Sequence, residues 1–157
     1  MRLSAIKSFA VLSGLSIVLF LLSPALAFDD PSILEAQRLF KQFVDLERAY
    51  DPAQADLYAP QAVIKDTRVY QDGENKTLTW TGDSYRQIIK AQLPVARARN
   101  EQFVYSQISY SKEGNNVRLR CTRSLPSRKF SSPLEMVFAP AQKNGWKIVE
   151  ETCQSQP

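Results

Sequence analysis

Three side chains that can bind ligands or move protons alternate along one stretch of the chain: Asp66, Arg68 and Tyr70. Residues two apart share a face of a β-strand, so the three are expected on the same side of one strand. A carboxylate between apolar walls can accept a proton near neutral pH, because desolvation raises its pKa. Arginine favours carboxylate and phosphate ligands, and an aromatic ring such as that of Trp80 supplies stacking area.

The sequence leaves two interpretations of these residues open. In the first, Asp66, Arg68, Tyr70 and Trp80 line a pocket for an acidic or aromatic ligand, with Asp66 as a candidate for proton transfer. In the second, Arg68 simply pairs with Asp66, which would lower the pKa of that carboxyl. The aromatic residues would then belong to the core or to cross-strand pairs.

The chain contains no histidine, and this narrows its chemistry. It lacks the commonest general base, the Ser-His and Cys-His nucleophile pairs, and the commonest metal ligand. The remaining residues do not define a reaction. The sequence therefore favours a non-catalytic role, and we expect neither a metal nor a cofactor.

A run of basic residues without an acidic one lies between Asn115 and Leu134, and it comprises Arg118, Arg120, Arg123, Arg128 and Lys129. Arg118 and Arg120 share the strand face opposite Leu119 and Cys121. Such a basic surface could contact an acidic protein, an envelope polymer or a membrane surface. A solvated strand face followed by a basic loop explains the pattern equally well.

Cys121 and Cys153 are the two cysteines of the chain. An even count in an oxidising compartment favours a disulfide between them. A meander order would place one strand between the two cysteines, at a separation of roughly 9–10 Å. A bridge needs Cα atoms closer than about 7 Å, so it requires the tail to bend or a different strand order.

The N-terminus has the pattern of an export signal. Arg2 and Lys7 precede an apolar run from Ser8 to Leu22, and Ala25-Leu26-Ala27 offers a cleavage site. The run is shorter than the about 20 residues that cross a membrane. We therefore expect residues 1–27 to be removed as a signal peptide, which leaves residues 28–157 as one periplasmic or secreted domain without stable membrane insertion.

The charge of that domain argues against nucleic acid as a partner. Arg2 and Lys7 leave with the signal, so 20 basic residues become 18 against 16 acidic ones, and the net charge falls from +4 to +2. A nucleic-acid-binding domain is typically far more basic.

Local patterns predict an α+β element order. Asp30 and Pro31 begin an amphipathic helix, and Asp51-Pro52 begins a short one up to Tyr58. A strand from Ala62 to Tyr70 and a returning strand from Lys76 to Thr81 follow, with a turn between them. A third helix begins at Gly82 and should kink or end at Pro94. Four antiparallel strands then occupy residues 103–152.

This order resembles the nuclear transport factor 2-like superfamily, with its SnoaL-like and ketosteroid isomerase-like branches. The stretch Leu57-Tyr58-Ala59-Pro60-Gln61-Ala62-Val63-Ile64-Lys65-Asp66 is similar to a motif of that superfamily, as are Gly82 before a helix and the closing Trp146–Glu151 strand. The resemblance implies a cone-shaped fold, in which N-terminal helices pack on a curved, mainly antiparallel sheet of about six strands. It also implies a homodimer as one arrangement.

The resemblance places Asp66 where ketosteroid isomerases carry their proton-transfer carboxylate. The position of their oxyanion-binding tyrosine is here occupied by Phe43, which has no donor. We therefore expect an exported, non-catalytic module that binds a small molecule or a protein partner. An isomerase-type enzyme using Asp66, and an envelope interaction protein using the basic strand 118–129, remain the alternatives.

Overall fold

The computed structural model describes residues 30–142 and 145–156. The predicted signal peptide, residues 1–27, lies outside the described residues. Within the described part, no helix combines the length and the apolar character needed to cross a membrane.

The first helix, α1 (Pro31–Ala49), begins where the sequence predicts. The Asp30 side chain accepts a hydrogen bond from the Ser32 amide at 2.9 Å and so caps the helix. The helix ends at Tyr50, which adopts a left-handed conformation with φ 53°. A short 3₁₀ helix, η1 (Pro52–Leu57), follows and is capped by Asp51 in the same way.

The second long helix, α2 (Gly82–Ala98), continues past Pro94, so the predicted end of the helix at Pro94 is wrong. Tertiary contacts hold the turn beyond the proline. The Arg97 guanidinium lies 5.8 Å from the centre of the Tyr50 ring and donates to the Ala49 carbonyl at 3.5 Å. At its start, the helix touches the sheet so closely that a Cβ on Gly82 would lie 1.8 Å from the Ala59 carbonyl oxygen.

Six strands form one mixed sheet in the order β2-β1-β6-β5-β4-β3. The β1–β6 pair is parallel and the other neighbours are antiparallel. The strands are β1 (Tyr58–Val69), β2 (Asn75–Thr81), β3 (Val104–Glu113), β4 (Asn116–Leu125), β5 (Phe130–Ala141) and β6 (Gly145–Ser155). A further 3₁₀ turn, η2 (Pro126–Arg128), joins β4 to β5.

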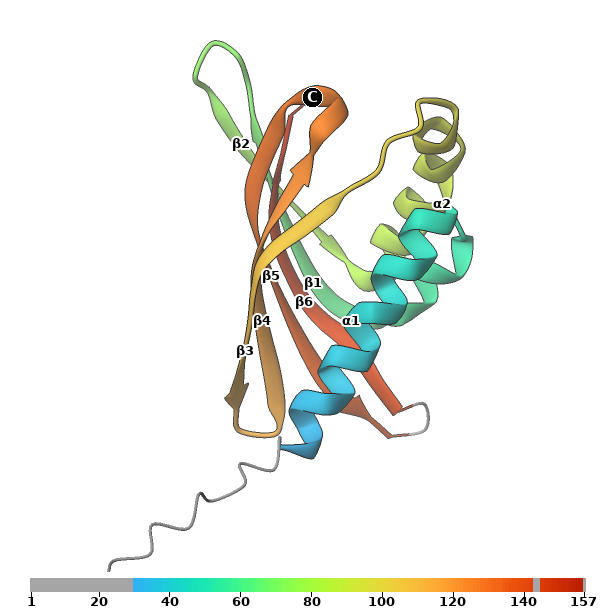
Figure 1. Ribbon diagram of the computed structural model, residues 1–157, viewed down its shortest axis with the longest axis vertical. Helices are drawn as coiled ribbons and strands as arrows, with labels where there is room; N and C mark the ends of the chain where they lie inside the picture. Colours follow the sequence, from blue (N-terminus) through green and yellow to red (C-terminus); the bar gives the residue numbers. More distant parts are fainter. Residues whose placement is uncertain (1–29, 143–144, 157) are drawn as a thin grey trace, which may run out of the picture.

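The sheet curves, and both long helices lie on its inner face, which is the face turned toward α1 and α2 (Figure 1). The core fills the space between them. Phe40 and Phe43 of α1 meet a layer of fully buried sheet residues, namely Ile64, Leu119, Leu134, Met136, Phe138 and Ile148. The predicted α+β class with about six strands is therefore confirmed.

Candidate ligand-binding site

Strand register gathers polar residues on the inner face, beyond the apolar layer. Asp66 on β1 lies opposite Cys153 on β6, and Arg68 lies opposite Ser155. Farther across the sheet, Arg123 on β4 lies between Ser132 of β5 and Tyr105 of β3. Side chains from five strands therefore meet along the inner face.

Arg123 is the central group of this region. It follows Leu119 and Cys121 at two-residue steps, so it shares their inward face. Its guanidinium lies 4.6 Å from the centre of the Phe103 ring and donates to the Gln154 carbonyl at 3.4 Å. The buried Nε has no hydrogen-bond partner among the described residues. Arg123 therefore lies on the inner face of β4, away from Arg118 and Arg120 of the predicted basic surface.

Glu151 of β6 lies deepest in the region and is 1% exposed. The Tyr58 hydroxyl donates to it, and the Tyr85 hydroxyl donates to its other oxygen at 3.4 Å. Burial raises the pKa of Glu151, while the charge of Arg123 and the Tyr58 hydrogen bond act in the opposite direction. Burial and the neighbouring carboxyl hold the pKa of both tyrosines well above its usual value, so both hydroxyls stay protonated.

A second inward carboxyl comes from α1. Glu47 is half-buried, and the Tyr105 hydroxyl donates to it at 2.6 Å. Burial raises the pKa of Glu47, against the Tyr105 hydrogen bond and the charge of Arg123. Two carboxyls thus flank one guanidinium at longer range, and none of the ion pairs within the described residues involves Arg123.

Aromatic rings surround these charged groups. Tyr85 packs edge-on against Tyr58, with ring centres 5.2 Å apart, and tilts against Trp80 at 5.9 Å. Trp80 itself is partly buried against the core. An arginine that has an unpartnered Nε and forms no ion pair among the described residues is a group that can bind an anion. We call Arg123, Glu47, Glu151, Tyr58, Tyr85 and Tyr105 the inner cluster.

Asp66 lies on the inner face, and its hydrogen-bond partners come from β6. The Ser155 hydroxyl donates to one oxygen at 2.7 Å, and the Cys153 thiol lies 3.7 Å from the other. No ion pair joins Asp66 to Arg68 within the described residues. The parallel pairing of β1 with β6 explains the difference, because it supplies hydrogen-bond donors beside the carboxylate.

Tyr70 lies apart from the inner cluster. It lines a shallow surface pocket of about 440 Å³ at the β1–β2 turn, together with Val69, Gln71, Asp72 and Gln156. None of these residues belongs to the inner cluster, and Asp66, Arg68 and Trp80 are not among the residues that line this pocket.

Carboxylates from outside the stretch between Asn115 and Leu134 neutralise much of the predicted basic surface. Arg118 binds Glu113 at 2.7 Å and Glu135 at 3.3 Å, and Arg120 lies 3.4 Å from Glu135. In the loop after β4, Arg128 binds Glu101 at 2.6 Å, while Lys129 is exposed. The acidic partners lie outside the stretch from Asn115 to Leu134, which is why counting charges within it missed them.

The predicted disulfide is not present in the structure. Cys121 and Cys153 are both free and buried. Leu134 of β5 pairs with Cys121 on one side and with Cys153 on the other, so a whole strand separates them. Two strand spacings are about 9–10 Å, beyond the reach of a disulfide. Among the described residues, no group of three or more acidic or thiol side chains could hold a metal ion.

Comparison with known proteins identifies the fold. No protein-family model and no curated protein matches the sequence. Among solved structures, a nuclear transport factor 2-like protein with a cystatin-like fold from Novosphingobium aromaticivorans is 14% identical, with 78% of this chain and 80% of that chain covered and a TM-score of 0.56. The chain therefore has the nuclear transport factor 2-like fold.

Two similar structures come from proteins described as candidate enzymes. The candidate ketosteroid isomerase of Parabacteroides distasonis is 15% identical, with 80% of this chain and 88% of that one covered and a TM-score of 0.56. The candidate dehydratase of Streptomyces avermitilis is 13% identical, with 78% and 95% covered and a TM-score of 0.57. At identities this low, the structural similarity shows the shared fold alone, and any activity has to be argued from the residues of the site.

Most of the inner cluster was missed at the level of sequence, although one member left a signal. Glu47 continues the inward stripe of Ala36, Phe40 and Phe43 by a four-residue step. The sequence gives no such signal for Glu151, because strict alternation from Ile148 would turn its side chain outward. A register shift where β5 pairs with β6, at Val137 and Phe138, brings it inward.

Proposed function

We propose that this chain is an exported, non-catalytic binding module that holds a small organic anion on its inner face. The observation that supports this most is Arg123. Its guanidinium lies against the Phe103 ring, donates to one carbonyl, and forms no ion pair with the described residues. Burying an arginine with so few partners is costly, and a bound anion would offset that cost.

The surrounding groups restrict the kind of anion. A carboxylate matches the planar fork of arginine and can accept two parallel hydrogen bonds. The rings of Tyr85 and Trp80 would pack against a flat or cyclic body. Glu47 and Glu151 would repel a second negative group, so the preferred ligand carries one anionic group and an otherwise neutral body.

The position of the acidic groups supports binding over catalysis. Asp66, the predicted proton-transfer residue, already accepts hydrogen bonds from Ser155 and Cys153. Glu151 is enclosed by Tyr58 and Tyr85 and is 1% exposed. A catalytic carboxyl must come within hydrogen-bond reach of its substrate, and neither group is free to do so in this arrangement.

Thermal unfolding with matched ligand pairs tests the proposal. Benzoate, phenylacetate and cyclohexanecarboxylate are each compared with the corresponding neutral amide. A ligand that binds only the native state raises the melting temperature by mass action. We expect the carboxylates to raise it, the amides to have little effect, and Arg123→Met to abolish the response.

Arg120→Met is the matched control, because Arg120 lies on the same strand but points outward and is 55% exposed in its side chain. This variant should respond to the carboxylates as the unmodified chain does. Equal stabilisation by amides and carboxylates, or an unchanged response in Arg123→Met, would contradict the proposal.

A further inference from the structure

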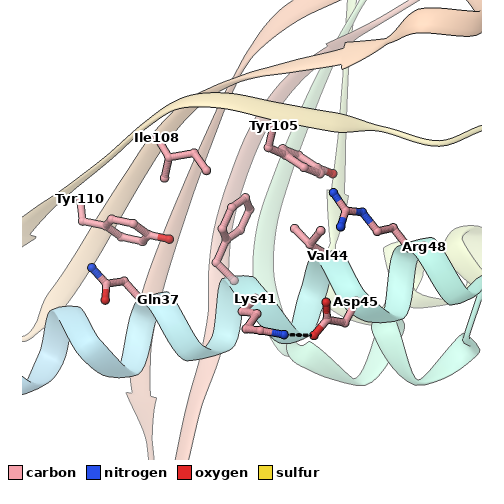
Figure 2. Close-up of a pocket in the computed structure, with 9 residues that line it drawn as sticks. Gln37, Lys41, Val44, Asp45, Arg48, Tyr105, Ile108 and Tyr110 are labelled. Atoms are coloured by element: carbon pink, nitrogen blue, oxygen red, sulfur yellow. Dashed lines mark hydrogen bonds and ion pairs between the residues drawn. The ribbon is translucent and has the colours of Figure 1, made fainter.

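A groove of about 390 Å³ lies between α1 and the edge strand β3, outside the inner cluster apart from Tyr105 (Figure 2). Six side chains of α1 and three of β3 line it: Gln37, Phe40, Lys41, Val44, Asp45 and Arg48, with Tyr105, Ile108 and Tyr110. Its volume falls within the range of small-molecule sites in proteins.

The groove exists because α1 is attached to the β3 side at both ends. Near the start of the helix, Lys112 binds Asp30 at 2.6 Å. At its other end, Gln102 donates to the Tyr50 hydroxyl at 2.7 Å. Between these two attachments, β3 has no further strand beside it, since it forms the edge of the sheet. The helix and the strand therefore form the two walls of an open groove.

A bulge in β3 turns apolar side chains into this channel. The register with β4 shifts between Ser106 and Ser109, and Gln107 has a positive φ of 54°. Tyr105 and Tyr110 are an odd number of residues apart, so a regular strand would point them to opposite faces. With the bulge, both line the groove together with Ile108 (Figure 2). Ile108 is 45% exposed, so it offers apolar surface that a ligand could cover.

The groove carries an uncompensated positive charge at one of its two ends. Lys41 is neutralised by Asp45 at 2.5 Å. Arg48 forms no ion pair with the described residues, and its guanidinium lies beside Val44 and near Tyr105 at one end (Figure 2). Gln37 and Tyr110, both neutral, occupy the other end. One positive charge thus stands at one end of an apolar floor.

We propose that this groove binds a monoanionic amphiphile with a medium-length acyl chain, such as a free fatty acid. The carboxylate would bind Arg48, and the chain would lie over Phe40, Val44 and Ile108 toward Tyr110. Gln37 and Arg48 are eleven residues apart on a helix, which corresponds to about 16 Å. The lining therefore extends over about three turns of the helix, a length that suits an extended chain.

The test is calorimetry and methyl nuclear magnetic resonance with dodecanoate below its micelle concentration, on the chain from residue 28 onward. We expect saturable binding that shifts the methyl signals of Ile108 and leaves those of buried Ile148 in place. Arg48→Gln should weaken binding about tenfold, as expected for the loss of one charge-assisted hydrogen bond. Arg38→Gln, an exposed arginine elsewhere on α1, should bind as the unmodified chain does.

Three results would overturn the proposal: unchanged Ile108 signals at saturation, equal affinity for dodecanol, or equal affinity in Arg48→Gln. Stronger, Arg48-dependent binding to phosphatidylglycerol vesicles would also overturn it, in favour of a membrane surface. Arg123→Met separates this site from the inner cluster, because it should abolish the response to benzoate while dodecanoate binding persists.

Discussion

The two faces of strand β4 carry the same residue type in opposite situations. On the outer face, Arg118 and Arg120 bind carboxylates of the neighbouring strands β3 and β5. On the inner face, Arg123 lies against an aromatic ring with one carbonyl as its hydrogen-bond acceptor. The outer arginines are satisfied within the chain and contribute to its surface. The inner arginine is poorly satisfied, and such a group is more informative about ligands than any count of basic residues.

Removing the carboxyl of Glu151 should have the largest effect on the free energy of unfolding. Glu151→Ala leaves the hydroxyls of Tyr58 and Tyr85 without their acceptor and opens a cavity in the core. We expect a loss of about 3 kcal/mol in the free energy of unfolding, measured by urea denaturation. Glu150→Ala, next to it on the outer face and exposed, should cost less than about 0.5 kcal/mol. Equal losses in the two variants would remove the contrast between the faces.

The pH dependence of stability should also differ between the faces. The folded-state pKa of Glu151 is raised, so its stabilising contribution is fully present below the unfolded value near 4.5 and is lost as the pH rises through the folded pKa. Glu151→Gln should therefore remove a decline in stability above about pH 4.5, with a slope of up to about 1.4 kcal/mol per pH unit.

The pH dependence of stability has the opposite sign for Glu113 on the outer face. Its pKa is lowered by the hydrogen bond from Arg118, so the stability it contributes is present above its unfolded pKa and is lost as the pH falls through the folded one. Urea denaturation across pH 3–8 would measure both trends. A decline above pH 4.5 that is identical in Glu151→Gln would show that this carboxyl is not responsible for it.

Substitution of an arginine on the outer face should have the smallest effect on the free energy of unfolding. Arg118→Met removes hydrogen bonds to Glu113 and Glu135 on a partly exposed surface, so we expect a loss of at most about 1 kcal/mol. Salt should reduce this difference, because ions screen exposed charges. Thermal unfolding at low and high salt measures it, and a loss larger than that of Glu151→Ala would reverse the comparison.

Sequence patterns located most of the elements but only part of the site. The alternation in β1 correctly placed Asp66 inward, and the same rule would have placed Arg123 beside Cys121. The meander order expected for the last four strands is the one observed, and it separates Cys121 from Cys153 by a full strand. The pairing of β1 with β6 could not be read from local patterns, and through it Ser155, rather than Arg68, binds the Asp66 carboxylate.

The sequence by itself determined what depends on neighbouring residues. The caps at Asp30 and Asp51, the helical stripe through Phe40 and Phe43, and the alternation within β1 and β4 all follow from short-range geometry. The tertiary structure decided what depends on register between distant strands. The shift near Phe138 turns Glu151 inward, and the bulge at Gln107 lines the groove. Such shifts exchange the faces of a strand by a single residue, and the energy that selects them comes from packing across the whole sheet.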